Sequence, residues 1–336
     1  MRSNVLVTAA SRRVALVQAF QRALRARGGG QVIVTDINPL SPAVHVADRA
    51  YLVPMSDAPD YLDEIATICD AEGVGLLIPT IDDELELFAG SRDWFARRGV
   101  RVAVSPEETA SLCNDKYKTC THLREAGVAA AATFRPQDLP PQVRYPLFVK
   151  PRIGRGGVGA YRVRNARELQ FFLDYVPDAV VQEYLDGPEF TIDVLCDFEG
   201  RVLSVVPRQR VVIRAGVIDR GRTSGDPSLI RLAQDCAKAL RFAGAVNIQC
   251  RIVRGQPVIF EINPRFSGGI PLTIAAGADF PGWLVDLAAG RAVEPGIGRF
   301  QPDFWMTSYE ASFFLDDDRV TALRASGGAE RMGDAA

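Results

Sequence analysis

The chain has few of the residues on which the commonest protein catalysts depend. It contains only two histidines, His45 and His122, among 336 residues. A histidine-based zinc site and a Ser-His-Asp triad are therefore disfavoured. The six cysteines are scattered without a CxxC pair: Cys69, Cys113, Cys120, Cys196, Cys236 and Cys250. This spacing predicts reduced thiols in a cytoplasmic protein, not a disulfide or zinc framework.

Long apolar runs and a strong net charge are also missing. No segment approaches the run of about 18 apolar residues typical of a membrane-spanning helix, and the N-terminus lacks an uninterrupted apolar signal core. A net charge of −2 argues against a general nucleic-acid binder. We therefore expect a soluble protein without membrane or nucleic-acid partners, long enough for two or three domains.

The first hundred residues alternate between short apolar strands and amphipathic helices. Expected strands are Val5–Thr8, Val32–Asp36, Leu76–Thr80 and Val100–Ser105, and expected helices are one between a Ser11 cap and Gly28, Asp60–Ala71 and Asp83–Arg97. Such alternation predicts an open parallel α/β sheet. Asp36 ends a strand as the ribose-binding acid of dinucleotide folds does, but residues 8–13 lack GxGxxG, which disfavours nicotinamide binding. The strand ends are expected to form one wall of a substrate site.

Residues 246–269, VNIQCRIVRGQPVIFEINPRFSGG, predict a tight hairpin. With a three-residue loop centred on Gly255, Gln249 lies opposite Glu261, and Asn263 shares the face of Glu261 along with Ile259. Oxygen ligands of this kind suit Mg²⁺ that is shared with substrate phosphates. The alternative is a half-buried hairpin whose outer face is simply polar.

A strand ending in Lys150 leads into a glycine-rich loop, Arg152–Gly159. Its glycines are Gly154, Gly156, Gly157 and Gly159. They allow close backbone approach and a nest of amides for an anion, to which a lysine adds a point charge. The loop does not match GxxxxGK[ST], so a P-loop is excluded, while a flexible hairpin turn stays open as an alternative.

Residues 180–189, VVQEYLDGPE, read as an apolar strand that breaks into an extended segment. Backbone groups there can meet an adenine edge, Glu183 can accept from its exocyclic amine, and Glu189 can accept from ribose hydroxyls. Asp193 follows on the face of Glu189. Taken singly, these acids are equally consistent with solvated surface residues.

In this order the motifs resemble the ATP-grasp superfamily, specifically single-unit proteins similar to half of a carbamoyl-phosphate synthase large subunit and ATP-dependent carboxylate–amine ligases. The resemblance implies α/β and α+β classes, with a pre-ATP-grasp open parallel α/β domain at 1–112 followed by a two-lobed ATP-grasp clamp at 113–315. The smaller lobe would cover 113–183 and the larger lobe 184–315. One further strand, Trp305–Leu315, and a flexible tail at 316–336 are expected.

The resemblance also implies roles for individual residues. Lys116 and Lys150 would contact ATP phosphates, Arg152–Gly159 would be a mobile flap, and Arg265 would stabilise the transferred phosphate. Adenine would meet Glu183, Tyr184 and Leu185, and ribose would meet Glu189. Mg²⁺, with Mn²⁺ as an alternative, would be held by Gln249, Glu261 and Asn263.

A basic segment, residues 208–222, contains four arginines considered for the substrate: Arg208, Arg210, Arg214 and Arg222. If extended, its first three share one face and suit an anionic substrate or an acylphosphate, with Arg214 also a catalytic candidate. A solvated strand edge is the alternative. Ser267 and Gly268 would present amides to the substrate carboxylate.

The implied reaction is ATP-dependent coupling of a carboxylate to an amine through an acylphosphate, giving ADP and phosphate. Its partners would be small-molecule acids and amines, with a homodimer possible for such relatives. A weak candidate for general base is Asp193. Two alternatives stay open: a carbamoyl-phosphate-synthase-like subunit acting on bicarbonate or carbamate, and a nucleotide-binding protein without catalysis.

Overall fold

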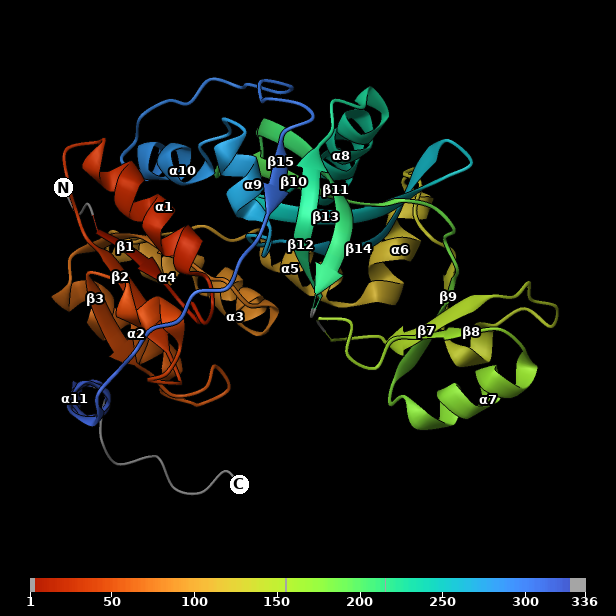
Figure 1. Ribbon diagram of the computed structural model, residues 1–336, viewed down its shortest axis with the longest axis horizontal. Helices are drawn as coiled ribbons and strands as arrows, with labels where there is room; N and C mark the ends of the chain where they lie inside the picture. The colour runs from red at the N-terminus through yellow and green to blue at the C-terminus, as the bar shows by residue number, and fades with distance from the viewer. Residues whose placement is uncertain (1–3, 155, 215, 327–336) are drawn as a thin grey trace. The chain divides into compact units, whose positions relative to one another are not determined.

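A computed structural model describes residues 4–154, 156–214 and 216–326 (Figure 1). The chain divides into two compact units. Unit 1 comprises the described residues of 1–104, 279–294 and 309–336, and unit 2 those of 105–278 and 295–308. Within the described ranges, no helix is long and apolar enough to cross a membrane. All six cysteines are free thiols, as the sequence predicts, and all six are buried.

Unit 1 is built on a five-stranded parallel sheet of order β3-β2-β1-β4-β5. This confirms the open parallel α/β fold expected from the alternating pattern. Its strands are β1 Asn4–Val7, β2 Val32–Asp36, β3 Arg49–Leu52, β4 Val74–Ile78 and β5 Arg101–Val102. Its helices are α1 Val14–Arg25, α2 Tyr61–Ala71, α3 Leu85–Gly90, α4 Arg92–Arg97, α10 Phe280–Ala288 and α11 Asp317–Ser326, with short 3₁₀ turns η1 Pro42–His45 and η2 Asp82–Glu84.

Two helical expectations for unit 1 are wrong in detail. Ser11 does not cap α1; it has φ +47°, its N–H donates to Asp36 Oδ2 at 2.7 Å, and the helix begins at Val14 without a side-chain cap. The expected helix over 83–97 is three pieces, η2, α3 and α4, with Ser91 between the last two. The Asp36 side chain therefore holds the loop that follows β1 and does not point into solvent.

The two later segments of unit 1 return to it after the chain has completed most of unit 2. Figure 1 draws α10 beside α1, and α11 packs near β3. The sequence predicts contiguous domains, whereas these compact units are discontinuous. Within the predicted tail, residues 317–326 form α11, and residues 327–336 lie outside the described residues.

Unit 2 contains a six-stranded antiparallel sheet of order β14-β13-β10-β11-β12-β15. The strands are β10 Glu189–Cys196, β11 Val202–Arg214, β12 Val217–Thr223, β13 Gly244–Val253, β14 Gln256–Asn263 and β15 Trp305–Thr307, so the last strand is shorter than expected. Accompanying helices are α5 Glu107–Asn114, α6 Lys116–Glu125, α8 Pro227–Leu240 and α9 Ile270–Ala275. Apolar residues of α5, α6 and α8 bury one face of this sheet, which leaves the other face for polar groups.

The second sheet of unit 2 is four-stranded and antiparallel, of order β6-β9-β7-β8. It consists of β6 Thr133–Phe134, β7 Leu147–Pro151, β8 Tyr161–Val163 and β9 Ala179–Glu183, with η3 Pro136–Asp138 and α7 Ala166–Tyr175. Leu169 of α7 packs with Val149 and Val181 to form a separate small core, and Figure 1 shows α7 against this sheet. Two sheets with two cores give unit 2 the two-lobed form that the sequence predicts.

Candidate functional site

The uncovered face of the six-stranded sheet is lined with polar side chains. Alternation along β10 places Ile192 and Val194 in the core and Asp193 on the opposite face. Along β13 it likewise separates Ile248 and Cys250 from the polar positions. The polar residues of this face include Glu189, Asp193, Arg208, Arg210, Asn247, Gln249, Glu261 and Asn263. So many charged groups on one sheet face predict a site and not a packing surface.

The register of the β13–β14 hairpin brings Gln249 opposite Glu261, as predicted. The loop itself is different: only Arg254 and Gly255 separate the strands, with φ +50° and +80°, typical of a type I′ turn. By itself, a turn one residue shorter than predicted would shift the pairing of the two strands by one residue. The register also changes between Gln249 and Cys250, and this second change compensates for the first. Phe260 is the extra residue there, a β-bulge that restores the predicted pairing at the site.

The bulge also corrects the predicted faces of β14. Ile259 is expected beside Glu261, yet it is fully buried in the core together with Ile262. One inserted residue reverses the alternation between these two positions. Phe260 instead places its ring 5.6 Å from Lys150 Nζ.

The main-chain carbonyl of the bulge contributes to holding Lys150. Lys150 Nζ donates to Phe260 O at 3.3 Å and to Gln182 Oε1 at 2.9 Å. Burial lowers the pKa of this ammonium, Glu261 opposes the shift by attraction, and Lys116 adds to it by repulsion. The predicted phosphate lysine therefore lies next to the predicted metal-binding hairpin.

Gln182 is a site residue that the motif analysis misses. Its carbonyl oxygen accepts from Lys150, and its amide nitrogen donates to Thr133 Oγ1 at 2.8 Å. Gln182 is 3% exposed, so its amide orientation is fixed by buried partners. In the sequence it reads as an ordinary strand residue before Glu183, and only its polar character in an apolar run could have marked it.

Lys116 and the glycine-rich loop meet at one point. Lys116 Nζ donates to Gly154 O at 2.6 Å. Its position is fixed because the Asp115 carboxylate caps α6 and lies 3.4 Å from Arg152 Nε. The four glycines of the loop all have φ between +67° and +149°, which side-chain-bearing residues rarely adopt. Residue 155 of the predicted flap lies outside the described residues.

The segment predicted to meet adenine follows β9. Glu183 is exposed, and its Oε1 accepts the N–H of Ala132 at 2.7 Å. Leu185 is buried, and the Tyr184 ring lies 4.3 Å from the Arg162 guanidinium. Gly187 is required by close approach, because a Cβ there would lie 1.9 Å from Ile252 O.

Glu189 lies between two arginines. Its Oε1 accepts from Arg210 at 2.7 Å and its Oε2 from Arg251 at 2.6 Å. Arg210 also donates to Gln249 Oε1 at 3.2 Å and to Gly216 O at 2.7 Å. Arg210 thus connects the predicted ribose acid, Glu189, with a predicted metal ligand, Gln249. The sequence instead predicts that Arg210 binds the substrate.

The loop after β14 orders the remaining oxygen ligand. Asn263 donates from Nδ2 to Glu261 Oε1 at 3.3 Å, and its Oδ1 accepts from Arg265 at 3.2 Å. Arg265 also donates to Phe266 O at 3.1 Å. Glu261, Asn263 and Arg265 are therefore brought together as predicted.

Arg208 is not an accessible substrate ligand. It is 1% exposed, and its guanidinium holds the Asp193 carboxylate at 2.7 and 3.1 Å and donates to Ser267 Oγ at 2.9 Å. Asp193 also accepts from Thr273 at 2.5 Å. Asp193 is itself buried, and its two oxygens are already occupied by these donors. Gly268 is exposed beside Ser267.

The other two arginines of the basic segment contact residues outside the polar face described above. Arg214 is 56% exposed at the side chain and donates to Asp219 at 3.1 Å. Arg222 donates to Asp303 at 2.9 Å and lies 5.4 Å from the Trp305 ring. A register shift near Val212 interrupts β11, so the regular alternation that puts Arg208, Arg210 and Arg214 on one face is lost.

The oxygen donors of the hairpin fit a magnesium ion. Gln249, Glu261 and Asn263 supply one carboxylate and two amide oxygens, a set typical of a hard cation that completes its coordination with phosphates and water. Among the described residues there is no group of three or more His, Cys, Asp or Glu placed to hold a metal. A magnesium ion held by this hairpin would consequently depend on amide oxygens and on the nucleotide for most of its ligands.

Two known families match parts of the chain. Residues 175–310 match a family described as "ATP-grasp in the biosynthetic pathway with Ter operon", and residues 5–103 match the "PylC-like, N-terminal domain". The fold is that of the ATP-grasp enzymes. The ATP-grasp match contains the segment predicted to meet adenine, the basic segment and the β13–β14 hairpin.

Curated relatives are carbamoyl phosphate synthase large chains. That of Thermoanaerobacter sp. (strain X514) is 24% identical over 306 residues, which are 81% of this chain and 27% of the relative. That of Thermus thermophilus is 25% identical over 304 residues, 82% of this chain and 28% of the relative. The chain thus spans little more than a quarter of the length of these relatives.

Solved ATP-grasp structures share the architecture at low identity. The biotin carboxylase domain of Hydrogenobacter thermophilus 2-oxoglutarate carboxylase, solved with MgADP and bicarbonate, has a TM-score of 0.71 at 20% identity, covering 90% of this chain and 73% of that one. The L-amino acid ligase from Bacillus licheniformis has a TM-score of 0.68 at 18% identity, covering 89% and 77%. N5-carboxyaminoimidazole synthetase from Staphylococcus aureus, complexed with ADP, has a TM-score of 0.68 at 15% identity, covering 87% and 79%. These likenesses establish the ATP-grasp fold.

Proposed function

We propose that this protein is an ATP-dependent ligase that activates a carboxylate as an acylphosphate and couples it to an amine, with release of ADP and phosphate. The observation that carries the proposal is the contact of Lys150 with the bulged strand of the β13–β14 hairpin. It brings a lysine suited to phosphate, from strand β7, next to the hairpin that carries Glu261, Asn263 and Arg265. A site built this way suits transfer of a phosphoryl group.

The nucleotide would lie between the two sheets of unit 2. Lys116 and Lys150 bind its phosphates, and the amides of the glycine-rich loop cover them. Glu183 still has an oxygen to accept from the adenine amine, and the Leu185 backbone meets the ring edge. Because a carboxylate offers about four lone-pair positions, Glu189 can hold ribose hydroxyls while it keeps its two arginines.

Gln249, Glu261 and Asn263 would hold Mg²⁺. When bound, such an ion would supply positive charge that offsets the negative charge of the nucleotide phosphates. Arg265, ordered by the Asn263 side chain, stabilises the γ-phosphoryl group as it passes to the acid. The acid oxygen forms the new P–O bond while the bond to ADP breaks. The amine then attacks the acyl carbon, and phosphate leaves.

Bicarbonate is a second candidate for the acid, because the curated relatives that match more than four-fifths of this chain are carbamoyl phosphate synthase large chains. In that version bicarbonate takes the place of an organic acid at the same phosphoryl-transfer centre. The coarser assignment, an ATP-grasp enzyme, is common to both candidates.

The deciding experiment incubates the full chain with Mg-ATP, panels of carboxylic acids including bicarbonate, and either amines or hydroxylamine as a trap for acylphosphates. We expect ADP and phosphate release that depends on one acid, with a hydroxamate when hydroxylamine is present. AMP and pyrophosphate as products would contradict the acylphosphate route. ATP binding without acid-dependent turnover would favour a non-catalytic nucleotide-binding protein.

A further inference from the structure

Strand alternation and register place the side chain of Gln182 beside Lys150. Val149 of β7 and Val181 of β9 face the core of the small sheet. Their neighbours Lys150 and Gln182 therefore share the opposite face, on adjacent strands. Across β6 and β9, Gln182 pairs directly with Thr133. Lys150 and Gln182 are both buried, so their polar atoms need partners within the protein.

The hydrogen bonds around Gln182 run in one direction. Thr133 Oγ1 donates its single proton to Ala131 O at 3.0 Å, so towards Gln182 it can only accept. Gln182 Nε2 donates to that hydroxyl oxygen at 2.8 Å, which turns its Oε1 towards Lys150 Nζ at 2.9 Å. The Thr133 hydroxyl thus decides which end of the amide meets the ammonium.

The oxygens that accept from Lys150 among the described residues are both neutral. One is Gln182 Oε1, and the other is the carbonyl of Phe260, the bulge residue. A glutamate at position 182 would instead form an ion pair that offsets the charge of the ammonium. An ammonium has three N–H donors, so these two contacts leave one for a phosphate oxygen.

The bulge carbonyl connects this arrangement to the predicted metal ligands. Phe260 O accepts from Lys150 at 3.3 Å and from Gln182 Nε2 at 3.5 Å. Glu261 follows Phe260 directly in β14. Displacing the Gln182 amide would therefore move the ammonium relative to the strand that carries a proposed metal ligand.

We propose that Gln182 is the positioning residue of Lys150: its amide fixes the ammonium for the nucleotide phosphates without offsetting the positive charge. The inference rests on the nucleotide site of the proposed function and deepens it, whichever acid or amine is used. A residue with only a packing role could be replaced by any side chain of similar volume. For Gln182, the direction of the amide and its neutrality both matter.

The test measures binding of Mg²⁺ with the non-hydrolysable analogue AMPPNP to the full chain by calorimetry. Gln182→Met keeps the volume but removes the acceptor, so Kd should rise about tenfold. Gln182→Glu keeps an acceptor but adds negative charge, so Kd should rise about tenfold further. Packing alone predicts the reverse order, because glutamate is the closer in shape. Kd for adenosine, which has no phosphate, should stay unchanged in both variants.

Further variants show whether the effect passes through Lys150. In a Lys150→Met background, Gln182→Met should cause no additional loss, because the group that it positions is gone. Thr133→Val removes the hydroxyl that directs the amide, so it should raise Kd for AMPPNP about threefold, but not in the Gln182→Met background. Gln170→Met is the matched control. Gln170 is an exposed glutamine of α7 that donates to Asp174, so its loss should change neither Kd.

Four outcomes would overturn the inference while leaving the ligase function standing. They are unchanged AMPPNP binding by Gln182→Met, a glutamate variant that binds at least as tightly as the methionine variant, losses that add in the Lys150→Met background, and a parallel loss of adenosine affinity. Binding of AMPPNP without acid-dependent ADP release from ATP would contradict the ligase function alone. If the unsubstituted protein binds no AMPPNP, the proposed function fails, and the inference with it.

Discussion

At the scale of single residues, Glu261 is the group on which the proposed chemistry most depends. It pairs with Gln249, accepts from Asn263, and is the one carboxylate of the predicted metal ligands. Glu261→Gln keeps the shape and removes the charge. We expect kcat to fall by a factor corresponding to about 3 kcal/mol, the range seen when one electrostatic group is lost from a transition state.

Steady-state ADP release measures this effect, and Arg222→Ala supplies the control. Arg222 lies in the same sheet but contacts Asp303 and Trp305, so its loss should leave kcat within twofold. Equal turnover of Glu261→Gln and the unsubstituted protein would show that the hairpin is only a polar surface.

A second residue, Glu84 of unit 1, links stability to pH. It is 2% exposed and accepts hydrogen bonds from Tyr61 and from Thr8 Oγ1. Burial raises the pKa of this carboxyl group from 4.5 to about 7. Between those values the folded protein keeps a proton that the unfolded chain has lost. Stability therefore decreases as pH rises, by about 3 kcal/mol in total.

Urea unfolding of unit 1 at pH 5 and pH 8 tests this linkage. Glu84→Gln resembles the protonated acid and has no charge to bury, so its free energy of unfolding should lose most of that pH dependence. A decline of the same size in the variant would assign the effect to other groups.

At the scale of elements, the sequence predicts how strands pair better than how they deviate. The prediction that Gln249 pairs with Glu261 assumes alternation and a three-residue loop centred on Gly255, and it is correct only because a bulge at Phe260 compensates for a turn that is one residue shorter. Neither the shorter turn nor the bulge could be predicted, because an inserted residue leaves no mark in an apolar–polar pattern. The same limit applies near Val212, where a register shift separates Arg214 from the face of Arg210.

Partners of charged residues are even harder to predict than faces. Alternation places Arg208 on the polar side of β11, which is correct, but Asp193 comes from a neighbouring strand and buries it. Gln182 acquires its role from Lys150 and Thr133 in the same way. Motifs identify side chains that can bind a ligand, whereas the tertiary structure decides which of them are already occupied.

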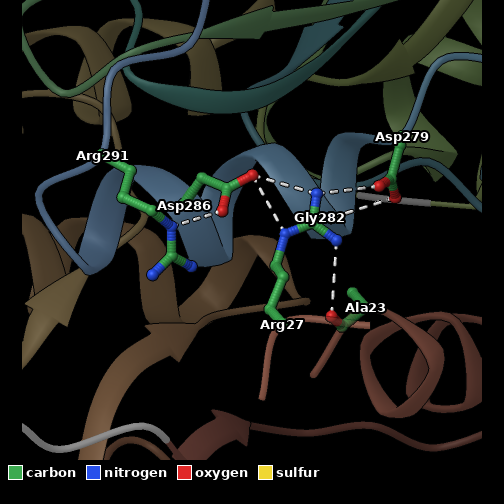
Figure 2. Close-up of polar contacts among 6 residues, drawn as sticks. All are labelled: Ala23, Arg27, Asp279, Gly282, Asp286 and Arg291. Atoms are coloured by element: carbon green, nitrogen blue, oxygen red, sulfur yellow. Dashed lines mark hydrogen bonds and ion pairs between the residues drawn. The ribbon is translucent and has the colours of Figure 1, made fainter. Parts of the chain in front are cut away.

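The contact of α1 with α10 shows how such partners hold an element in place. Arg27 donates to Asp286 at 3.0 Å and to Asp279 at 3.2 Å, while Asp279 caps α10 through Gly282 N–H (Figure 2). Both carboxylates remain partly exposed, which limits the energy of each ion pair. Arg27 is the residue that ties the returning segment to the end of α1.

We expect Arg27→Met to weaken this attachment by about 1 kcal/mol, since the methionine keeps much of the apolar stem but not the charge. Amide hydrogens of residues 280–288 should then exchange about fivefold faster by mass spectrometry. Arg22→Met, at an exposed position in the last turn of the same helix, serves as the control. Unchanged exchange in α10 would mean that apolar contacts alone hold it.

At the scale of the whole molecule, the division into units could not be derived from motifs. Residues 280–288 read as an apolar helix that any core could accept, and only the structure shows that they belong to unit 1. The residues proposed to bind nucleotide all belong to unit 2. A ligand that binds only the folded site stabilises the part of the chain that forms it.

Binding of Mg²⁺ with a non-hydrolysable ATP analogue should therefore slow amide exchange in unit 2 selectively. At one hundred times Kd the stabilisation approaches about 3 kcal/mol, enough to slow exchange about a hundredfold where opening exposes the site. We expect protection in β9, β13 and β14 and in residues 152–154, with the sheet of unit 1 unchanged. Removing Mg²⁺ with EDTA should abolish most of it, because the phosphates would then face Glu261 without a cation between them. Equal protection of both units would contradict a nucleotide site built from unit 2 alone, and protection insensitive to EDTA would contradict the metal-binding role of Gln249, Glu261 and Asn263.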